Sequence, residues 1–195
     1  MEKNIKQDCN NMKQITEFLS TRIAKPSIIK ATTDNIKDIV ESELKRLGPN
    51  ANLNHIDTSN VNGMPFLFAA FDVFGSPRRI ISDMYEDLNP DISEWDTSNV
   101  VTFYSMFSYC KSFNCDITGW NTKKLLTTER MFNGCESFNQ DISGWNIRNV
   151  TSMDFMFVGC SSFNQDLSHW DLTTVSHKHM FDKCPIKEEF KPKFK

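Results

Sequence analysis

Glycine is scarce in this sequence, with 7 among 195 residues, whereas phenylalanine is abundant at 16. A chain that turns often with so little glycine must build its turns from Asn, Asp, Ser and Thr, whose side chains bond to nearby backbone groups. Long apolar runs are also missing. No stretch approaches the roughly 18 apolar residues that a membrane-spanning helix needs, so a membrane span is not expected.

An excess of one sign of charge is missing too. The chain has 22 Lys and Arg against 25 Asp and Glu, a net charge of −3, so we expect no broad nucleic-acid-binding surface. The charges are uneven, because residues 86–182 have a net charge of −7 and residues 183–195 one of +3. The basic end could contact nucleic acid or an acidic partner. Because Phe190, Pro192 and Phe194 are interleaved with its lysines, we expect residues 185–195 to form a C-terminal cap or tail.

The first residues, MEKNIKQDCNNMKQ, lack the apolar core of a secretory signal peptide. This favours a cytoplasmic protein whose six cysteines are thiols rather than disulfides. A cell-surface or secreted location reached by a non-classical route is the alternative.

What the sequence does have is an internal repeat of 25 residues, which spaces Trp95, Trp120, Trp145 and Trp170 evenly. Other apolar positions keep this period, namely Phe113, Phe138 and Phe163, Met106, Met131 and Met156, and Cys110, Cys135 and Cys160. A period of this length is typical of proteins that stack one short unit on the next. We therefore expect these residues to form ladders in the core, with the tryptophans contributing strongly to stability.

The two ends of the repeat are irregular. Ile56 takes the tryptophan position of the first coil and lies 39 residues before Trp95, which predicts an insertion of about 14 residues within 72–87. The pair Ser76-Pro77 suggests that a helix begins in this insertion. The last coil is one residue short. Irregular terminal units are expected where a stacked core must be covered.

Each unit is predicted to contain a short strand and a short helical turn. Met153, Met156, Phe157 and Cys160 lie at helical spacing, and Gly159 is placed to end the turn. Residues 139–143 are short and centred on Ile142, which favours a strand. A unit of this size and content predicts an α/β repeat fold, a leucine-rich-repeat-like solenoid over residues 53–184.

The first 52 residues are predicted to form an α/β cap on the open end of the stack. Residues 34–47 have a helical apolar stripe of Ile36, Ile39, Val40, Leu44 and Leu47, with Thr33 or Asp34 as the cap and Gly48-Pro49 as the stop. Residues 27–32 favour a strand, and residues 11–23 a further helix. A separate functional domain is the alternative for this segment.

The segments FNQDISGWN, NVTSM and MFVGC resemble the 25-residue repeat of BspA-like surface proteins, also known from mycoplasma lipoproteins. The resemblance covers about residues 53–184. It implies a solenoid with a protein-interaction or adhesion role and no catalytic residue. The chain departs from the surface members because its start lacks an export signal.

Three groups of side chains are candidates for chemistry. The aspartates Asp91, Asp116, Asp141 and Asp166 could bind cations, but we expect them to bond to backbone groups at each turn. The ladder cysteines, which end with Cys184, are expected to be buried thiols, and Cys115 to be exposed. His177 and His179 lie near Asp182 and could ligate zinc, yet they belong to an irregular last coil. We expect no metal, no cofactor and no catalytic site.

The leading hypothesis is a non-enzymatic protein–protein interaction module, with another protein as partner and a monomer or weak oligomer as its state. The candidate partner-binding residues lie three or four positions after each tryptophan, where the residue type differs between coils, or in the predicted insertion. They are Ser98, Lys123, Lys124, Arg148 and Thr173, together with Arg78, Arg79 and Tyr85. Two alternatives remain, a leaderless surface adhesin and an enzyme with a pocket beside the insertion.

Overall fold

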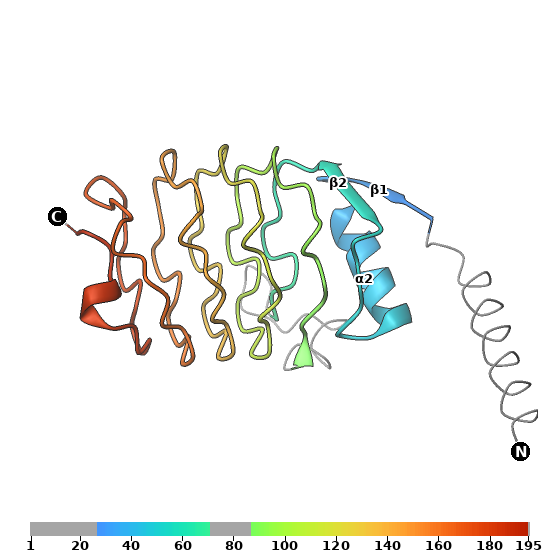
Figure 1. Ribbon diagram of the computed structural model, residues 1–195. Helices are drawn as coiled ribbons and strands as arrows, with labels where there is room; N and C mark the ends of the chain where they lie inside the picture. Colours follow the sequence, from blue (N-terminus) through green and yellow to red (C-terminus); the bar gives the residue numbers. More distant parts are fainter. Residues whose placement is uncertain (1–26, 71–86, 195) are drawn as a thin grey trace, which may run out of the picture.

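The computed structural model describes residues 27–70 and 87–194 (Figure 1). Its elements are β1 (Ile29–Thr32), α2 (Ile36–Leu47), β2 (Ile56–Asn60) and a short 3-10 helix, η2 (Glu188–Phe190). Strands β1 and β2 pair in parallel, with Ile29 opposite Ile56. The predicted strand and helix before residue 48 are therefore present. The predicted helix over residues 11–23 and residues 72–86 of the predicted insertion lie outside the described residues.

Helix α2 packs on the core through Ile36, Val40 and Leu44, which are buried at four-residue intervals. It ends at Gly48, whose φ of 91° suits glycine and whose N–H donates to the carbonyl of Leu44. Two details of the prediction are wrong. Asn35 precedes the helix in place of Thr33 or Asp34, because the Thr33 hydroxyl bonds to Asn62 instead. Leu47, at the last turn, is 44% exposed.

The repeated segments stack side by side (Figure 1). Single parallel bridges join Gly63 to Thr102, Thr102 to Thr127, Thr127 to Ser152 and Ser152 to Ser176. Along this side, alternate backbone N–H groups of one coil donate to carbonyls of the next. Thr128, Arg130, Phe132 and Gly134, for example, donate to Ser152, Asp154, Met156 and Val158. Each coil is therefore bonded to its neighbour over the whole of this side.

The predicted helical turn is wrong. Residues 153–160 form successive turns, in which Met156 and Cys160 each donate to the carbonyl three residues before, while Phe157 and Gly159 donate to the next coil. Phe155 and Gly159 have φ of 60° and 71°, which a right-handed helix does not allow. Residues 139–143 form no strand either. The apolar spacing that suggested a helix arises because every third or fourth side chain of this turn series points inward.

The predicted ladders lie in the core. Phe107, Phe132 and Phe157 stack at 5.9 and 5.8 Å between ring centroids, and Phe138 stacks on Phe113 and Phe163. The four tryptophans are at most 5% exposed, and each indole N–H donates to a carbonyl of the preceding coil. Buried indoles with a partner for their N–H combine a large apolar contact area with a satisfied polar group.

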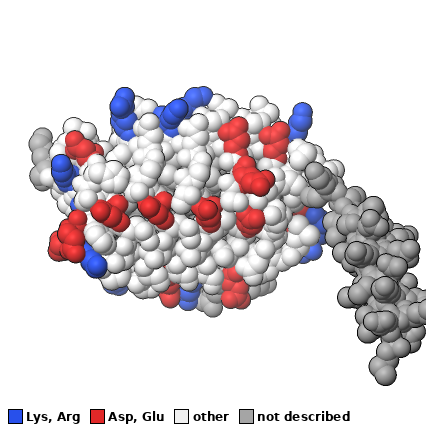
Figure 2. All heavy atoms as spheres, in the orientation of Figure 1, with Lys and Arg blue, Asp and Glu red and all other residues white. Residues whose placement is uncertain are grey.

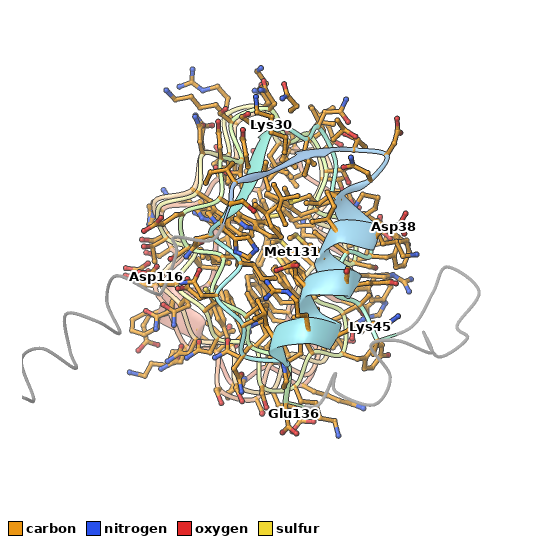
Figure 3. The ribbon with its side chains drawn as sticks, turned by 90° about the vertical axis from the view of Figure 1, so that its right-hand side faces the viewer. Lys30, Asp38, Lys45, Asp116, Met131 and Glu136 are labelled. Atoms are coloured by element: carbon orange, nitrogen blue, oxygen red, sulfur yellow. The ribbon has the colours of Figure 1, made fainter. Side chains whose placement is uncertain are left out.

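The two ends of the stack are covered differently. Seen along the stack from the N-terminal side, α2 lies across the end (Figure 3). At the other end, Leu167 and Leu172 donate to the carbonyls of Phe190 and Lys193, and Asp171 is bridged to Lys193. Residues 185–194 thus cover the half of the last coil that contains Trp170.

Candidate functional site

A row of acidic side chains crosses the coils (Figure 2). We use "aspartate face" for the side that carries Asp91, Asp116, Asp141 and Asp166. The Oδ1 of each accepts the N–H of the residue two positions later, in a side-chain turn. The hydrogen bonds of these turns hold the pKa of Asp116, Asp141 and Asp166 below its usual range. These carboxylates therefore shape the chain, as the sequence suggested.

Asparagines beside this row join one coil to the next. The Oδ1 of Asn89, Asn114 and Asn139 accepts the backbone N–H of the asparagine in the following coil, at 2.9 to 3.0 Å. Asn164 accepts in the same way from Lys187. The uniformity of the aspartate face thus has a structural cause. Among the described residues, no group of three or more His, Cys, Asp or Glu is placed to hold a metal ion.

The slots after the tryptophans, predicted to bind a partner, are also parts of turns. The backbone N–H groups of Ser98, Lys123, Arg148 and Thr173 each donate to the side chain two residues before. The side chains of Lys123, Arg148 and Thr173 are exposed, that of Ser98 is half-buried, and Lys124 bonds to Asn99. Arg78, Arg79 and Tyr85 lie outside the described residues.

A different side of the stack has the features of a recognition surface. We use "bridge face" for the side formed by residues 101–109, 126–134, 151–159 and 175–183, where the coils are bridged. Two positions in each of these ranges have a left-handed backbone, and the first of them continues into the preceding coil at Phe66. The residues at the first position are Phe66, Ser105, Arg130, Phe155 and His179, with φ between 52° and 60°. A residue with a side chain in this conformation is disfavoured by about 1–2 kcal/mol, least for Asn and Asp.

The side chains of this left-handed column contact one another. The Arg130 guanidinium lies 4.7 Å from the centroid of the Phe155 ring, and Phe155 stacks on His179 at 5.2 Å. The Phe66 ring packs edge-on against Tyr104 at 5.1 Å. Arg130 and His179 are exposed and Phe155 is half-buried. The column therefore presents Arg130 and His179 to solvent with Phe155 between them, whereas Ser105 is buried.

A second left-handed column provides the comparison. It consists of Tyr109, Gly134, Gly159 and Lys183, with φ between 57° and 77°. Glycine fills two of its four positions, as the backbone favours. At Gly134 the ring of Tyr109 lies so close that an added Cβ would be 2.8 Å from it. The first column contains no glycine, and its side chains differ from coil to coil.

Neighbouring bridge-face positions also vary between coils. Tyr104, Glu129, Asp154 and Lys178 occupy equivalent places, so an aromatic, two acids and a base follow one another along the stack. On the aspartate face, by contrast, the Asn and Asp positions that form the turns are the same in every coil. The sequence analysis missed the bridge face because it assigned these residues to a helix. Their variation from coil to coil is nevertheless visible when the 25-residue units are compared.

The histidines do not converge on a site. His177 Nδ1 lies 2.8 Å from the carbonyl of Val175, and its ring stacks on Phe194. His179 Nδ1 lies 2.8 Å from Asp182, and His169 Nε2 lies 3.0 Å from the carbonyl of Ser143. Each ring thus has its own partner.

Cys110, Cys135 and Cys160 are buried, and the thiols of Cys135 and Cys160 donate to the carbonyls of Phe107 and Phe132 in the preceding coil. Burial raises the pKa of both thiols well above its usual range. Cys184 and Cys115 are half-buried, so the expected exposure of Cys115 is wrong, and desolvation also raises their pKa. A thiol with a raised pKa is a poor nucleophile.

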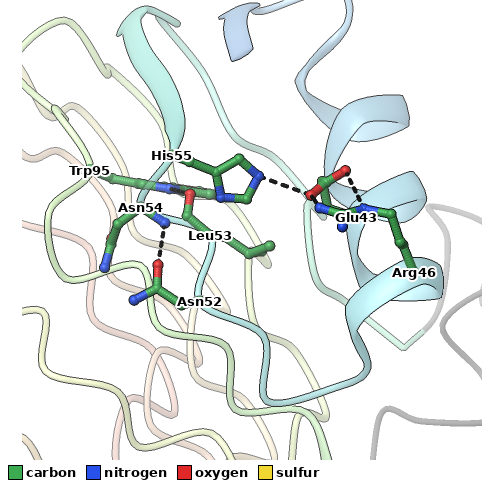
Figure 4. A network of polar contacts seen from close by, with 7 residues as sticks. All are labelled: Glu43, Arg46, Asn52, Leu53, Asn54, His55 and Trp95. Atoms are coloured by element: carbon green, nitrogen blue, oxygen red, sulfur yellow. Dashed lines mark hydrogen bonds and ion pairs between the residues drawn. The ribbon is translucent and has the colours of Figure 1, made fainter. Parts of the chain in front are cut away.

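One buried polar group was missed from the sequence (Figure 4). Glu43 of α2 is 8% exposed, and its carboxylate lies 2.9 Å from the Nε2 of His55, which is 6% exposed. The Arg46 guanidinium bonds to the same carboxylate and is the main cause that lowers the pKa of Glu43. This group joins α2 to the first coil and accounts for an acidic residue on the buried side of the helix.

The stack of 25-residue coils defines a repeat protein. Residues 78–193 match the family described as a Mycoplasma protein of unknown function, DUF285, and the chain belongs to this family. No curated protein and no solved structure matches the chain. Within the described residues, no helix has the length and hydropathy that a membrane crossing requires.

Proposed function

We propose that this chain is a non-enzymatic protein-binding module of the BspA-like, leucine-rich-repeat-like type, and that the bridge face binds the partner. In this proposal the coils form a solenoid whose core ladders set a constant spacing. The bridge face then offers side chains that differ from coil to coil, as extended recognition surfaces of repeat proteins do.

The observation that carries the proposal is the left-handed column. Its backbone favours glycine or asparagine, yet the chain places Phe, Ser, Arg, Phe and His there. Unfavourable backbone conformations occupied by large side chains are concentrated at functional sites. Arg and aromatic residues are also the types that contribute most to protein interfaces. In the second column glycine fills two of the four positions, whereas the first column has none.

The test compares a bridge-face variant with a variant of the slots predicted from the sequence. Arg130→Asn with Phe155→Asn removes the contact between the Arg130 guanidinium and the Phe155 ring. Asparagine is chosen because it tolerates a left-handed backbone. The lost cation–π contact and the lost stacking of Phe155 on His179 are each worth about 0.5–1.5 kcal/mol, and relief of backbone strain of about 1–2 kcal/mol at each position offsets them. We therefore expect an unchanged melting temperature. Lys123→Asn with Lys124→Asn is the matched control.

Each purified variant is used to capture proteins from a lysate of the source organism, with mass spectrometry as the readout. The proposal predicts one partner that wild type and the lysine variant retain and the bridge-face variant loses. Retention by the bridge-face variant together with loss by the lysine variant would place binding at the slots after the tryptophans. An adhesin role would show instead as recovery of the native protein at the cell surface after fractionation.

A further inference from the structure

The end of the stack farthest from α2 has an incomplete hydrogen-bonding pattern. In the three coils before it, alternate bridge-face N–H groups donate to carbonyls of the following coil, as Met153, Phe155, Phe157 and Gly159 do toward the last coil. The equivalent residues of the last coil are His177, His179, Phe181 and Lys183. Within residues 27–70 and 87–194, no acceptor lies against their N–H groups. We use "donor edge" for these four N–H groups.

The carbonyls of residues 176–182, beside the donor edge, are already engaged within the chain. The carbonyls of Ser176, Lys178, Met180 and Asp182 accept from the preceding coil. Those of His177, His179 and Phe181 accept the N–H three residues later. An ordinary extended strand has both N–H and C=O groups along each edge and would set some of its own N–H groups against this row, whereas the coils of this chain meet such a row with carbonyls alone. Carboxylates, which only accept, fit it better.

The surroundings of the donor edge are basic. Residues 177–194 contain five lysines and three acidic residues. Lys178 lies between two of the donors and Lys183 is itself a donor, and the side chains of both are exposed, as is that of His179. Glu188 is bonded to Lys191, and Asp182 to His179, which engages two of the three acidic side chains. Charge complementarity therefore favours an acidic occupant.

A second copy of the chain fits less well. Its own donor edge has the wrong polarity, because donors would face donors. The opposite end of its stack is crossed by α2 (Figure 3). The C-terminal segment of the same chain covers the other half of the last coil, through Leu167 and Leu172. On the bridge-face half the described contact of this segment is limited to the ring of Phe194, which stacks on His177 at 4.6 Å and lies edge-on to Phe181 at 6.4 Å, and none of its described carbonyls bonds to the donor edge.

We propose that the donor edge at His177, His179, Phe181 and Lys183 docks an acidic segment of a partner protein, whose carboxylate and carbonyl oxygens accept the four N–H groups. The donor edge is the last-coil end of the bridge face, but this proposal goes beyond the proposed function because it rests on backbone donors and not on the side chains of Arg130 and Phe155. The two proposals can therefore fail independently.

The test uses the full chain labelled with nitrogen-15 and a peptide of about eight residues that alternates glutamate with threonine, long enough to span the edge. Amide hydrogen exchange is followed for His177, His179, Phe181 and Lys183. Without peptide these unbonded N–H groups should exchange fast, and saturating peptide should slow them at least about tenfold. The peptide with lysine in place of glutamate should have no such effect.

Variants locate the site. Lys178→Glu with Lys183→Glu should weaken binding of the glutamate peptide about tenfold or more, because it reverses two flanking charges. Lys123→Glu with Lys124→Glu makes the same charge change elsewhere and should bind as wild type does. The Arg130→Asn, Phe155→Asn variant should also bind normally, which separates this result from that of the bridge-face test.

Four outcomes would overturn the proposal. The first is equal protection by the lysine peptide, and the second is protection confined to residues outside 177–183. The third is protection without peptide together with self-association in sedimentation velocity, which would make a second copy the occupant. The fourth is stronger protection by a single-stranded oligonucleotide than by the glutamate peptide, which would make the partner a nucleic acid.

Discussion

Trp145→Ala is the most informative perturbation of the core. The Trp145 side chain is 4% exposed and stacks on Trp120 at 6.4 Å, nearly parallel, with Phe103 and Phe132 also in contact range. The coils on both sides of Trp145 are hydrogen-bonded to the coil that contains it, so the surrounding side chains have little freedom to fill the cavity left by truncation. Truncation of a large aromatic residue in such a core costs about 3–5 kcal/mol.

The hydrogen bond of Trp145 adds a smaller amount. Its indole N–H donates to the carbonyl of Ile117 at 3.2 Å, but that carbonyl also accepts the backbone N–H of Trp120. Loss of the indole therefore leaves no unsatisfied acceptor, and the net loss is about 1 kcal/mol. Trp145→Phe, which removes the donor and part of the volume, should cost about 1–2 kcal/mol.

Urea unfolding followed by circular dichroism measures both variants. Since the free energy of unfolding of a typical domain is about 5–15 kcal/mol, the alanine variant should lose a third or more of its stability. The free energy of unfolding should decrease from wild type to Trp145→Phe and again from Trp145→Phe to Trp145→Ala. An alanine variant with an unchanged midpoint and slope would show that the tryptophan ladder does not stabilise the stack.

Three further predictions concern titratable groups. Cys135 and Cys160 should resist thiol reagents in the native state and react after denaturation; native labelling at the rate of a peptide thiol would contradict their burial. Since hydrogen bonds from Thr118 lower the pKa of Asp116 below its ordinary value of 3.8, its contribution to stability is present above that pH and is lost as the pH falls through the folded pKa. Asp116→Asn keeps the side-chain turn, because Asn121 and Asn146 form the same turn in their coils. The melting temperature of this variant should therefore fall less on acidification than that of wild type. An unchanged dependence of the melting temperature on pH would refute the contribution assigned to the Asp116 carboxylate. Glu43→Ala should cost about 1–3 kcal/mol because it leaves buried His55 without its partner, and a loss of stability no larger than that of an exposed helix substitution would contradict the coupling.

Much of the architecture could be predicted from the repeat. The spacing of Trp95, Trp120, Trp145 and Trp170 identified residues that share one ladder, and scarcity of glycine identified Asp and Asn as turn formers. Helix α2 was evident from its apolar stripe and from Gly48. These features depend on local patterns and on stacking of identical positions, which a sequence displays directly.

The conformation within each coil could not be predicted in the same way. Met153, Met156, Phe157 and Cys160 have helical spacing, but the N–H groups of Phe155, Phe157 and Gly159 bond to the next coil. Bonds between coils override the local preference, and they place Phe155 in a left-handed conformation. For the same reason the bridge face was overlooked as a candidate site. The Glu43–His55 pair was also hidden, because it joins residues 12 apart in different elements.

Site-specific photo-crosslinking tests the central claim, that the bridge face binds the partner. A photoreactive phenylalanine analogue is placed at Phe155, and in a control chain at Gly144, where an added side chain meets no atom within 4 Å. After irradiation in cells of the source organism, the account predicts one protein crosslinked from position 155 and absent from position 144. The same adduct from position 144, with none from position 155, would contradict it.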